Sequence, residues 1–105
     1  MSVQIAFFEK GNLAVSTVAV KDTPSNYETA ITHPDYQEGR IIVVQTYSTL
    51  RQAEAGHKKW VEKMTNDPPE VLRDKGNDLF SLLTDKKEGH GYWRNIPRRK
   101  ERVDL

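Results

Sequence analysis

Residues 46–64, TYSTLRQAEAGHKKWVEKM, contain the point at which the hydrophobic period changes from that of a strand to that of a helix. The side chains that recur at helical spacing on one face are Leu50, Ala53, His57, Trp60, Val61 and Met64. Ser48 or Thr49 can cap the helix, and Thr49 with Gln52 fits a capping box. The stretch therefore predicts an amphipathic helix over residues 49–65.

His57 lies inside this apolar stripe, and two interpretations of it stay open. In the first, the imidazole is a base or a ligand where the helix meets a sheet. In the second it is structural, together with Trp60: its ring packs on the sheet and donates its N–H to a backbone carbonyl. Gly56, just before it, weakens the helix by about 1 kcal/mol relative to alanine. This glycine either lets another backbone come close or is simply tolerated.

The segment before the helix predicts a hairpin. Residues 40–47 contain the continuous run IIVV, which is typical of a central strand buried on both faces. Tyr27 to Thr32 alternate as a strand does, and the intervening HPDYQEG has turn chemistry. In that turn Pro34 stops the ladder and Gly39 can take a positive φ.

A second hairpin is predicted at the N-terminus, with strands at Val3 to Phe8 and Leu13 to Val20 around a KGN turn. The fold class is therefore α+β, with about four antiparallel strands and the 49–65 helix across one face. Neither face of the second strand is strongly polar. We therefore expect a second copy to cover the open face of the sheet, in a dimer or a larger assembly.

After residue 66 the pattern predicts a second helical segment, over residues 68–84. Pro68 suits a first helical turn, and Gly76-Asn77 would divide the segment into two short helices. From residue 92 the chain reads as a basic tail with Trp93 and Ile96 as apolar anchors. The expected organisation is one domain over residues 1–91 and a tail over residues 92–105.

The composition excludes several classes of protein. A chain of 105 residues is one domain, and its net charge of +1 gives no overall attraction to nucleic acid or anionic membranes. It has no cysteine, which excludes disulfides and thiol chemistry. We expect no signal peptide and no membrane span, because no basic start precedes an apolar run and no run approaches 18 residues.

Motifs for catalysis and cofactors are absent from the sequence. It has no glycine-flanked serine elbow, no glycine-rich phosphate loop, no acidic calcium loop and no paired-histidine metal motif. We therefore expect no enzyme, no cofactor and no metal. An enzyme that uses His33, Asp35 and His57 stays the third hypothesis, because a carboxylate beside an imidazole can orient it for acid–base work.

Two surfaces are candidates for binding a partner. The first is the C-terminal basic cluster beside an aromatic side chain, made by Trp93, Arg94, Arg98, Arg99, Lys100 and Arg102. It could bind an acidic protein, bind phosphates and stack on a base, or be a solvated tail. The second is the hairpin surface of Tyr27, His33, Asp35, Tyr36 and Arg40, because tyrosine and arginine are enriched at binding hot spots. Ordinary turn chemistry explains the same composition.

Residues 27–66 resemble a family of small uncharacterised proteins encoded by tailed bacteriophages and their prophages. The positions that carry the resemblance are Glu28, Thr29, Tyr47, Ser48, Thr49, Ala53, Gly56, His57, Trp60, Val61 and Met64. The resemblance implies a phage origin and an α+β domain, located in the host cytoplasm or in the virion. It implies no mechanism.

The expected function is that of a phage protein–protein interaction module, either a virion or assembly component or a modulator of a host protein. The alternative is a nucleic-acid-associated accessory protein that uses the basic tail.

Overall fold

The computed structural model describes residues 2–20, 26–75 and 94–99. Its elements, in chain order, are β1 (Ser2–Lys10), β2 (Leu13–Val20), β3 (Tyr27–Thr32), the 3₁₀ turn η1 (Gln37–Gly39), β4 (Ile42–Tyr47), α1 (Leu50–Asn66), β5 (Val71–Asp74) and β6 (Arg94–Pro97). Strands β1 to β4 form an antiparallel sheet in the order β1-β2-β3-β4, and β5 pairs with β6 in a second, small sheet. The α+β class expected from the sequence is confirmed.

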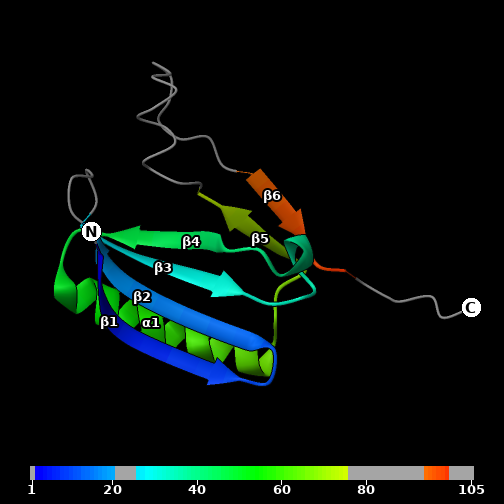
Figure 1. Ribbon diagram of the computed structural model, residues 1–105, viewed down its shortest axis with the longest axis horizontal. Helices are drawn as coiled ribbons and strands as arrows, with labels where there is room; N and C mark the ends of the chain where they lie inside the picture. Colours follow the sequence, from blue (N-terminus) through cyan, green and yellow to red (C-terminus); the bar gives the residue numbers. More distant parts are fainter. Residues whose placement is uncertain (1, 21–25, 76–93, 100–105) are drawn as a thin grey trace, which may run out of the picture.

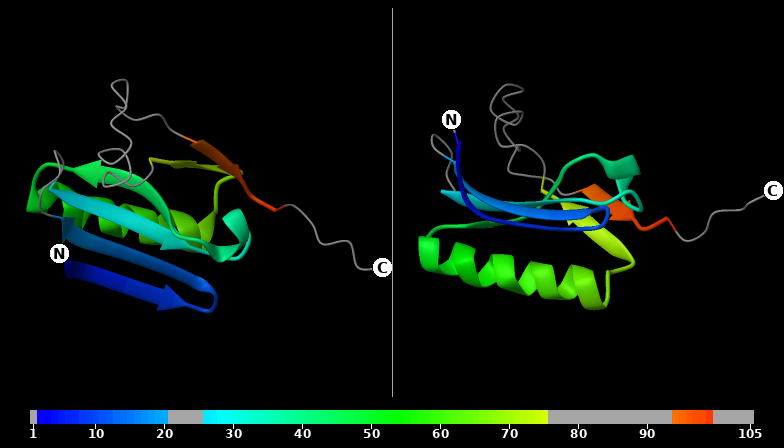
Figure 2. Two further views of the ribbon diagram at one scale, coloured as in Figure 1. Left: turned by 45° about the horizontal axis from the view of Figure 1, so that its top comes forward. Right: turned by 60° about the horizontal axis from the view of Figure 1, so that its bottom comes forward.

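The helix α1 lies across one face of the large sheet and leaves the other face uncovered by described elements (Figures 1 and 2). Buried side chains from the helix and from both sheets form one hydrophobic core. Its buried members are Leu13, Val15, Ile31, Tyr36, Ile42, Val44, Met64, Leu72 and Ile96, with Phe8, Trp60 and Val61 packed against them. A chain of this size buries a modest core, so the small sheet contributes a substantial part of it.

The predicted helix is present, with the predicted cap. The Thr49 hydroxyl accepts from the Gln52 backbone N–H at 3.1 Å, while the Gln52 side chain accepts from the Ser48 backbone N–H at 3.1 Å. The first bond satisfies an N–H that a helix start leaves without an intrahelical partner, and the second holds Ser48, the residue before the cap. Leu50, predicted on the apolar stripe, is 43% exposed, and Gly56 takes a buried place on the face instead.

The IIVV run differs from the prediction at one residue and in its place in the sheet. Ile41 precedes β4 and is 64% exposed, whereas the three residues that follow it are buried. β4 is the last strand of the large sheet and not a central one. It is buried on its outer side because β5 adjoins it: Lys75 N–H donates to the Val43 carbonyl at 2.8 Å, and Asp74 Oδ1 accepts from Val43 N–H at 3.2 Å.

The helical segment expected from Pro68 is wrong at residues 71–74, which form the strand β5. Its side chains alternate between exposed and buried, with Leu72 and Asp74 inside. This period of two is only four residues long, too short to override the helix-start signals of the preceding prolines. The partner that turns it into a strand is β6, which is distant in the sequence. The rest of the 68–84 segment lies outside the described residues.

The beginning of the expected tail packs with the domain. Ile96 pairs with Leu72 across the small sheet and is 7% exposed, so its prediction as an anchor is confirmed. The expected boundary between residues 91 and 92 lies outside the described residues. No helix in the described part of the chain is both long and apolar enough to cross a membrane.

Candidate functional site

The two surfaces predicted from the sequence meet at one place in the fold. Tyr36 forms an antiparallel bridge with Arg98, and Arg99 N–H donates to the Asp35 carbonyl at 2.7 Å. Arg98 N–H donates to the Glu70 carbonyl at 2.8 Å on the other side. Backbone hydrogen bonds therefore hold residues 98 and 99, just after β6, between the β3–β4 turn and the residue before β5.

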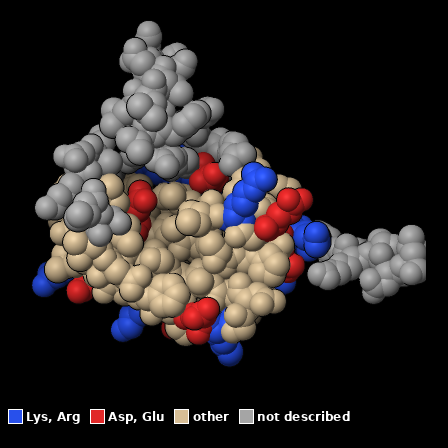
Figure 3. All heavy atoms as spheres, in the orientation of Figure 1, with Lys and Arg blue, Asp and Glu red and all other residues tan. Residues whose placement is uncertain are grey.

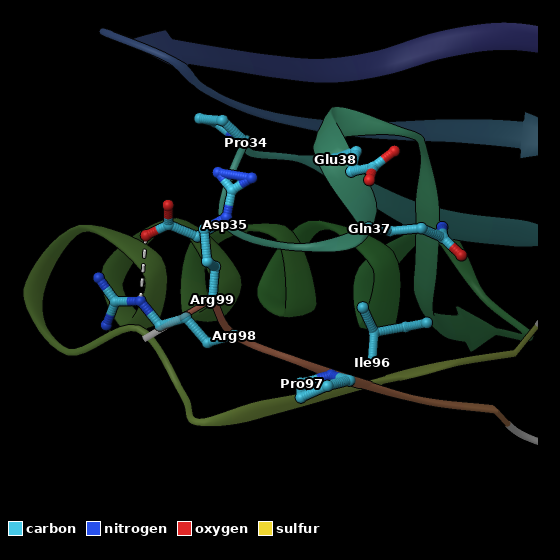
Figure 4. Close-up of a pocket in the computed structure, with 8 residues that line it drawn as sticks. All are labelled: Pro34, Asp35, Gln37, Glu38, Ile96, Pro97, Arg98 and Arg99. Atoms are coloured by element: carbon cyan, nitrogen blue, oxygen red, sulfur yellow. Dashed lines mark hydrogen bonds and ion pairs between the residues drawn. The ribbon is translucent and has the colours of Figure 1, made fainter. Parts of the chain in front are cut away.

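An open cleft of about 370 Å³ lies between this turn and β6 (Figure 4). Its lining residues are Pro34, Asp35, Gln37, Glu38, Ile96, Pro97, Arg98 and Arg99. The apolar part comes from Ile96 and the two prolines, and the polar part comes from both signs of charge. We call this the 34–38/β6 cleft.

The two arginines at the cleft are placed differently. Arg98 turns to the Asp35 carboxylate, with Nε 3.3 Å from Oδ2 (Figure 4). Arg99 extends from β6 toward Pro34 instead. Among the residues that the structure describes, neither the Arg99 guanidinium nor the exposed Glu38 carboxylate takes part in an ion pair or hydrogen bond. The cleft therefore presents one cation and one anion to a ligand.

The turn that forms one wall is held in an unusual backbone conformation. Gln37 and Glu38 have φ of 49° and 54°, followed by Gly39 at 82°. The prediction for Gly39 is confirmed, whereas the two preceding residues are in a region that side chains disfavour. Each such residue costs on the order of 1 kcal/mol, so the surrounding contacts must impose the conformation.

Tyr36 is the contact that anchors the turn. It is fully buried, and its hydroxyl donates to the Pro69 carbonyl. Burial raises the pKa of this phenol above its ordinary value, which keeps the hydroxyl protonated as a donor. The sequence makes Tyr36 a candidate for partner binding. The structure places it in the core, where its hydrogen bond to Pro69 holds the turn that lines the cleft.

The remaining candidates of the hairpin surface are separated. Tyr27 opens β3 and so lies at the opposite end of that strand from the turn. His33 lies beside the turn, where its Nδ1 accepts from Asp35 N–H at 3.0 Å and its ring meets Tyr36 edge-on. Arg40 is exposed just after the turn. The Asp35 carboxylate pairs with Arg98, so the contact between Asp35 and His33 runs through the backbone.

The rest of the basic cluster is described only in part. Arg94 begins β6 and pairs with Asp74 in the small sheet. Trp93, Lys100 and Arg102 lie outside the described residues.

His57 belongs to a buried polar chain that links the helix to three strands. Its Nδ1 lies 2.8 Å from the Thr17 hydroxyl, which lies 2.6 Å from the Thr29 hydroxyl, which lies 3.0 Å from the Tyr47 hydroxyl. The partner is thus a hydroxyl and not the backbone carbonyl that we expected. Thr17 and Thr29 were not singled out from the sequence, because an inward threonine in a strand resembles any β-former.

One order of donation satisfies every member of this chain. Tyr47 donates to Thr29, Thr29 to Thr17, and Thr17 to the bare Nδ1 of a neutral His57. The reverse order would leave the buried Tyr47 proton without an acceptor among the described contacts. Desolvation lowers the pKa of His57, in agreement with a neutral ring, and burial raises the pKa of Tyr47.

The packing of Tyr47 explains why a glycine precedes His57 in the sequence. A Cβ at this position would overlap with the ring of Tyr47, which packs directly on the helix backbone. It is therefore a side chain, and not another backbone, that needs the space. Trp60 lies further along the same face, where its Nε1 donates to the Gln45 side chain at 2.8 Å and Lys63 lies over its ring.

The comparisons with known proteins give no match. No family model matches the chain, and no curated protein and no solved structure is significantly similar to it. Among the described residues, no group of three or more histidines, aspartates and glutamates is placed to hold a metal ion.

Proposed function

We propose that this protein is a phage interaction module that binds a segment of a partner protein in the 34–38/β6 cleft, without catalysis. The observation that carries the proposal is that, among the described residues, the side chains of Arg99 and Glu38 have no ion pair or hydrogen bond, at a cleft that Ile96 and two prolines also line. Such a combination of an apolar patch and a few oriented charges is what a peptide segment recognises. The cleft is open, which suits a chain passing through it.

The chemistry of the cleft defines the partner segment. An acidic side chain can pair with the Arg99 guanidinium in a bidentate geometry, and an apolar side chain can cover Ile96 and the two prolines. A basic side chain elsewhere in the segment would meet Glu38. The expected ligand is therefore an extended segment with an acidic residue close to an apolar one.

The cleft is preorganised on both walls. The turn is fixed by the buried Tyr36, and β6 is fixed by Ile96 in the core. The Asp35–Arg98 pair joins the two walls directly, although a partly exposed pair of this kind contributes at most about 1 kcal/mol. A site that needs no ordering on binding loses less entropy, which favours affinity from a small contact area.

The phage assignment rests on the resemblance of residues 27–66, and it supports a place in the host cytoplasm or the virion. Small phage proteins commonly act as assembly components or as modulators of host proteins, and a preformed cleft serves either role. Nucleic acid is the less favoured partner, because Arg98 is neutralised by Asp35 and the Glu38 carboxylate repels phosphate at the same cleft.

Selection from a library of displayed random peptides tests the proposal. We expect selected peptides to share an acidic residue close to an apolar one, and to lose binding to the Arg99→Glu variant. Arg51→Glu is the matched control, because Arg51 is exposed on α1 and away from the cleft. It makes the same change of charge and should retain binding.

Peptides that bind both variants equally, or a library that yields no binder to the native protein, would contradict the cleft as the site. Binding of a labelled oligonucleotide that falls steeply with salt, and is lost in Arg99→Glu alone, would replace the proposal with the nucleic-acid alternative.

A further inference from the structure

Among the described residues, no strand pairs with the outer edge of β1. This strand is the first of the sheet, and its described pairing is with β2 alone. The opposite edge differs, because Asp74 and Lys75 bond the backbone of Val43 there. Unpaired backbone groups along an edge strand are a template for another strand.

The composition of β1 does not block such pairing. Residues 3–8, VQIAFF, contain no charge and no proline, the devices with which edge strands usually prevent it. Val3 and Phe7 are 56% and 50% exposed. The charged residues of the strand, Glu9 and Lys10, are both at its C-terminal end. An antiparallel pair of β1 strands therefore keeps the like charges of two copies at opposite ends.

A β-bulge at Ile5 interrupts the regular alternation of the β1 side chains between the helix side and the open side of the sheet. The register shifts between Gln4 and Ala6, so Ala6 and Phe8 face the helix opposite Thr17 and Val15, and Val3 shares that face opposite Ala19. Gln4 and Phe7 face the open side, opposite Val18 and Ser16. Along residues 3–8, the order of the directions in which the side chains point is therefore toward the helix (Val3), toward the open side (Gln4), the bulge (Ile5), toward the helix (Ala6), toward the open side (Phe7) and toward the helix (Phe8).

Apart from the bulge residue Ile5, which would lie opposite Ala6 of the second copy, this order is symmetric about the point between residues 5 and 6. In an antiparallel pair with that centre, Val3 lies opposite Phe8 of the second copy, and Gln4 lies opposite its Phe7. Both pairs then join residues of the same face, as an antiparallel ladder requires. A centre on residue 6 would set Gln4 against Phe8, on opposite faces, and a centre on residue 7 would set Gln4 against the helix-side Lys10.

We propose that a second copy of this chain binds along β1, with Gln4 of each copy opposite Phe7 of the other. The two-fold axis is perpendicular to the sheet, so the two large sheets become one and both helices lie on the same side. The exposed Val3 and Phe7 gain cross-strand neighbours, which stabilises the pairing. The partner is the same surface on the second copy, as two-fold symmetry demands.

One row of residues on the open face of the joined sheet is uncharged, whereas the adjacent row includes Glu28, which lies opposite Val18 and Thr46. The row Phe7, Ser16, Ala30 and Val43 crosses all four strands on the open side. Figure 3 shows this face, where it is not hidden by grey atoms, with an uncharged centre and charged side chains toward its margin. The segments that line each 34–38/β6 cleft are η1 and β6 with their neighbours, and Figure 1 shows η1 and β6 on the side of the sheet away from β1. Their position leaves both clefts accessible in the dimer.

Disulfide trapping tests the register, because the chain has no cysteine of its own. We expect an oxidised mixture of Gln4→Cys and Phe7→Cys chains to form a covalent dimer. Either variant alone should not, because like positions are then three residues apart along the ladder, about 10 Å. A disulfide needs Cα atoms within about 7 Å.

Light scattering after gel filtration tests the assembly itself. The native chain should be a dimer, and Phe7→Lys should be a monomer at the same concentration. Ile41→Lys is the control, because it places the same charge on an exposed isoleucine outside β1 and should remain a dimer. A monomeric native chain would overturn the proposal. A dimer without the mixed disulfide would equally overturn it, and would indicate a different dimer interface.

Discussion

Gly56 is the residue at which helix propensity and packing oppose each other. Replacing a glycine by alanine inside a helix normally stabilises it by about 1 kcal/mol. Here the added methyl group overlaps with the Tyr47 ring, which cannot move without breaking its bond to Thr29. We predict that Gly56→Ala destabilises the protein by about 1–3 kcal/mol, measured by urea unfolding.

The Tyr47→Leu background is the control for this prediction. Removing the ring removes the overlap, so Gly56→Ala should there be neutral or stabilising. An alanine that stabilises the native background would show that the ring does not pack on the helix backbone at this position.

His57 makes the stability of the fold depend on pH. Its pKa in the folded state is lowered from 6.5 by desolvation, so the unfolded chain binds the proton more readily. The stability from the neutral ring is therefore complete above pH 6.5 and is lost as the pH falls through the folded-state pKa. We predict that the urea midpoint of the native protein drops on acidification more than that of His57→Gln.

His33→Gln is the comparison for this measurement, because it removes an imidazole that lies outside the Thr17–Thr29–Tyr47 chain. The part of the pH dependence that His57→Gln removes should persist in His33→Gln. Parallel pH curves for the native protein and His57→Gln would contradict the assignment of a neutral, desolvated His57.

Among the helices and strands, the sequence predicts the features that depend on residues close to one another in the chain. Thr49 and Gln52 are close in the sequence and cap the same first turn, and α1 begins at Leu50, one residue after the start of the predicted range 49–65. β5 was predicted as helix because its strand partner is distant in the sequence. The cleft could not be predicted for the same reason: Asp35 and Arg98 are 63 positions apart. Each was a candidate, but nothing local pairs them.

The strand β6 is an integral part of the domain by this account. Ile96 is 7% exposed in the core cluster, so Ile96→Ala should cost about 2–5 kcal/mol in the free energy of unfolding. Ile41→Ala, at a 64% exposed position, should change it by less than about 0.5 kcal/mol. Equal effects in the two variants would place β6 outside the cooperative fold.

At the scale of the whole molecule, the sheet has two edges with different uses. One edge ends in β1, along which we propose that a second copy binds, and the other adjoins the small sheet and the cleft. A dimer of this kind is bivalent, so two weak peptide contacts on one partner assembly reinforce each other through effective concentration. Repetitive structures such as virions and their assembly intermediates offer repeated segments of this kind.

The most direct test of the binding cleft is an NMR titration of the isotope-labelled protein with a peptide selected against it. We predict that the largest amide shifts lie at residues 35–38, 96, 98 and 99, and that the same peptide leaves the spectrum of Arg99→Glu unchanged. Largest shifts on the open face of the sheet, with these residues unaffected, would show that the cleft does not bind the partner.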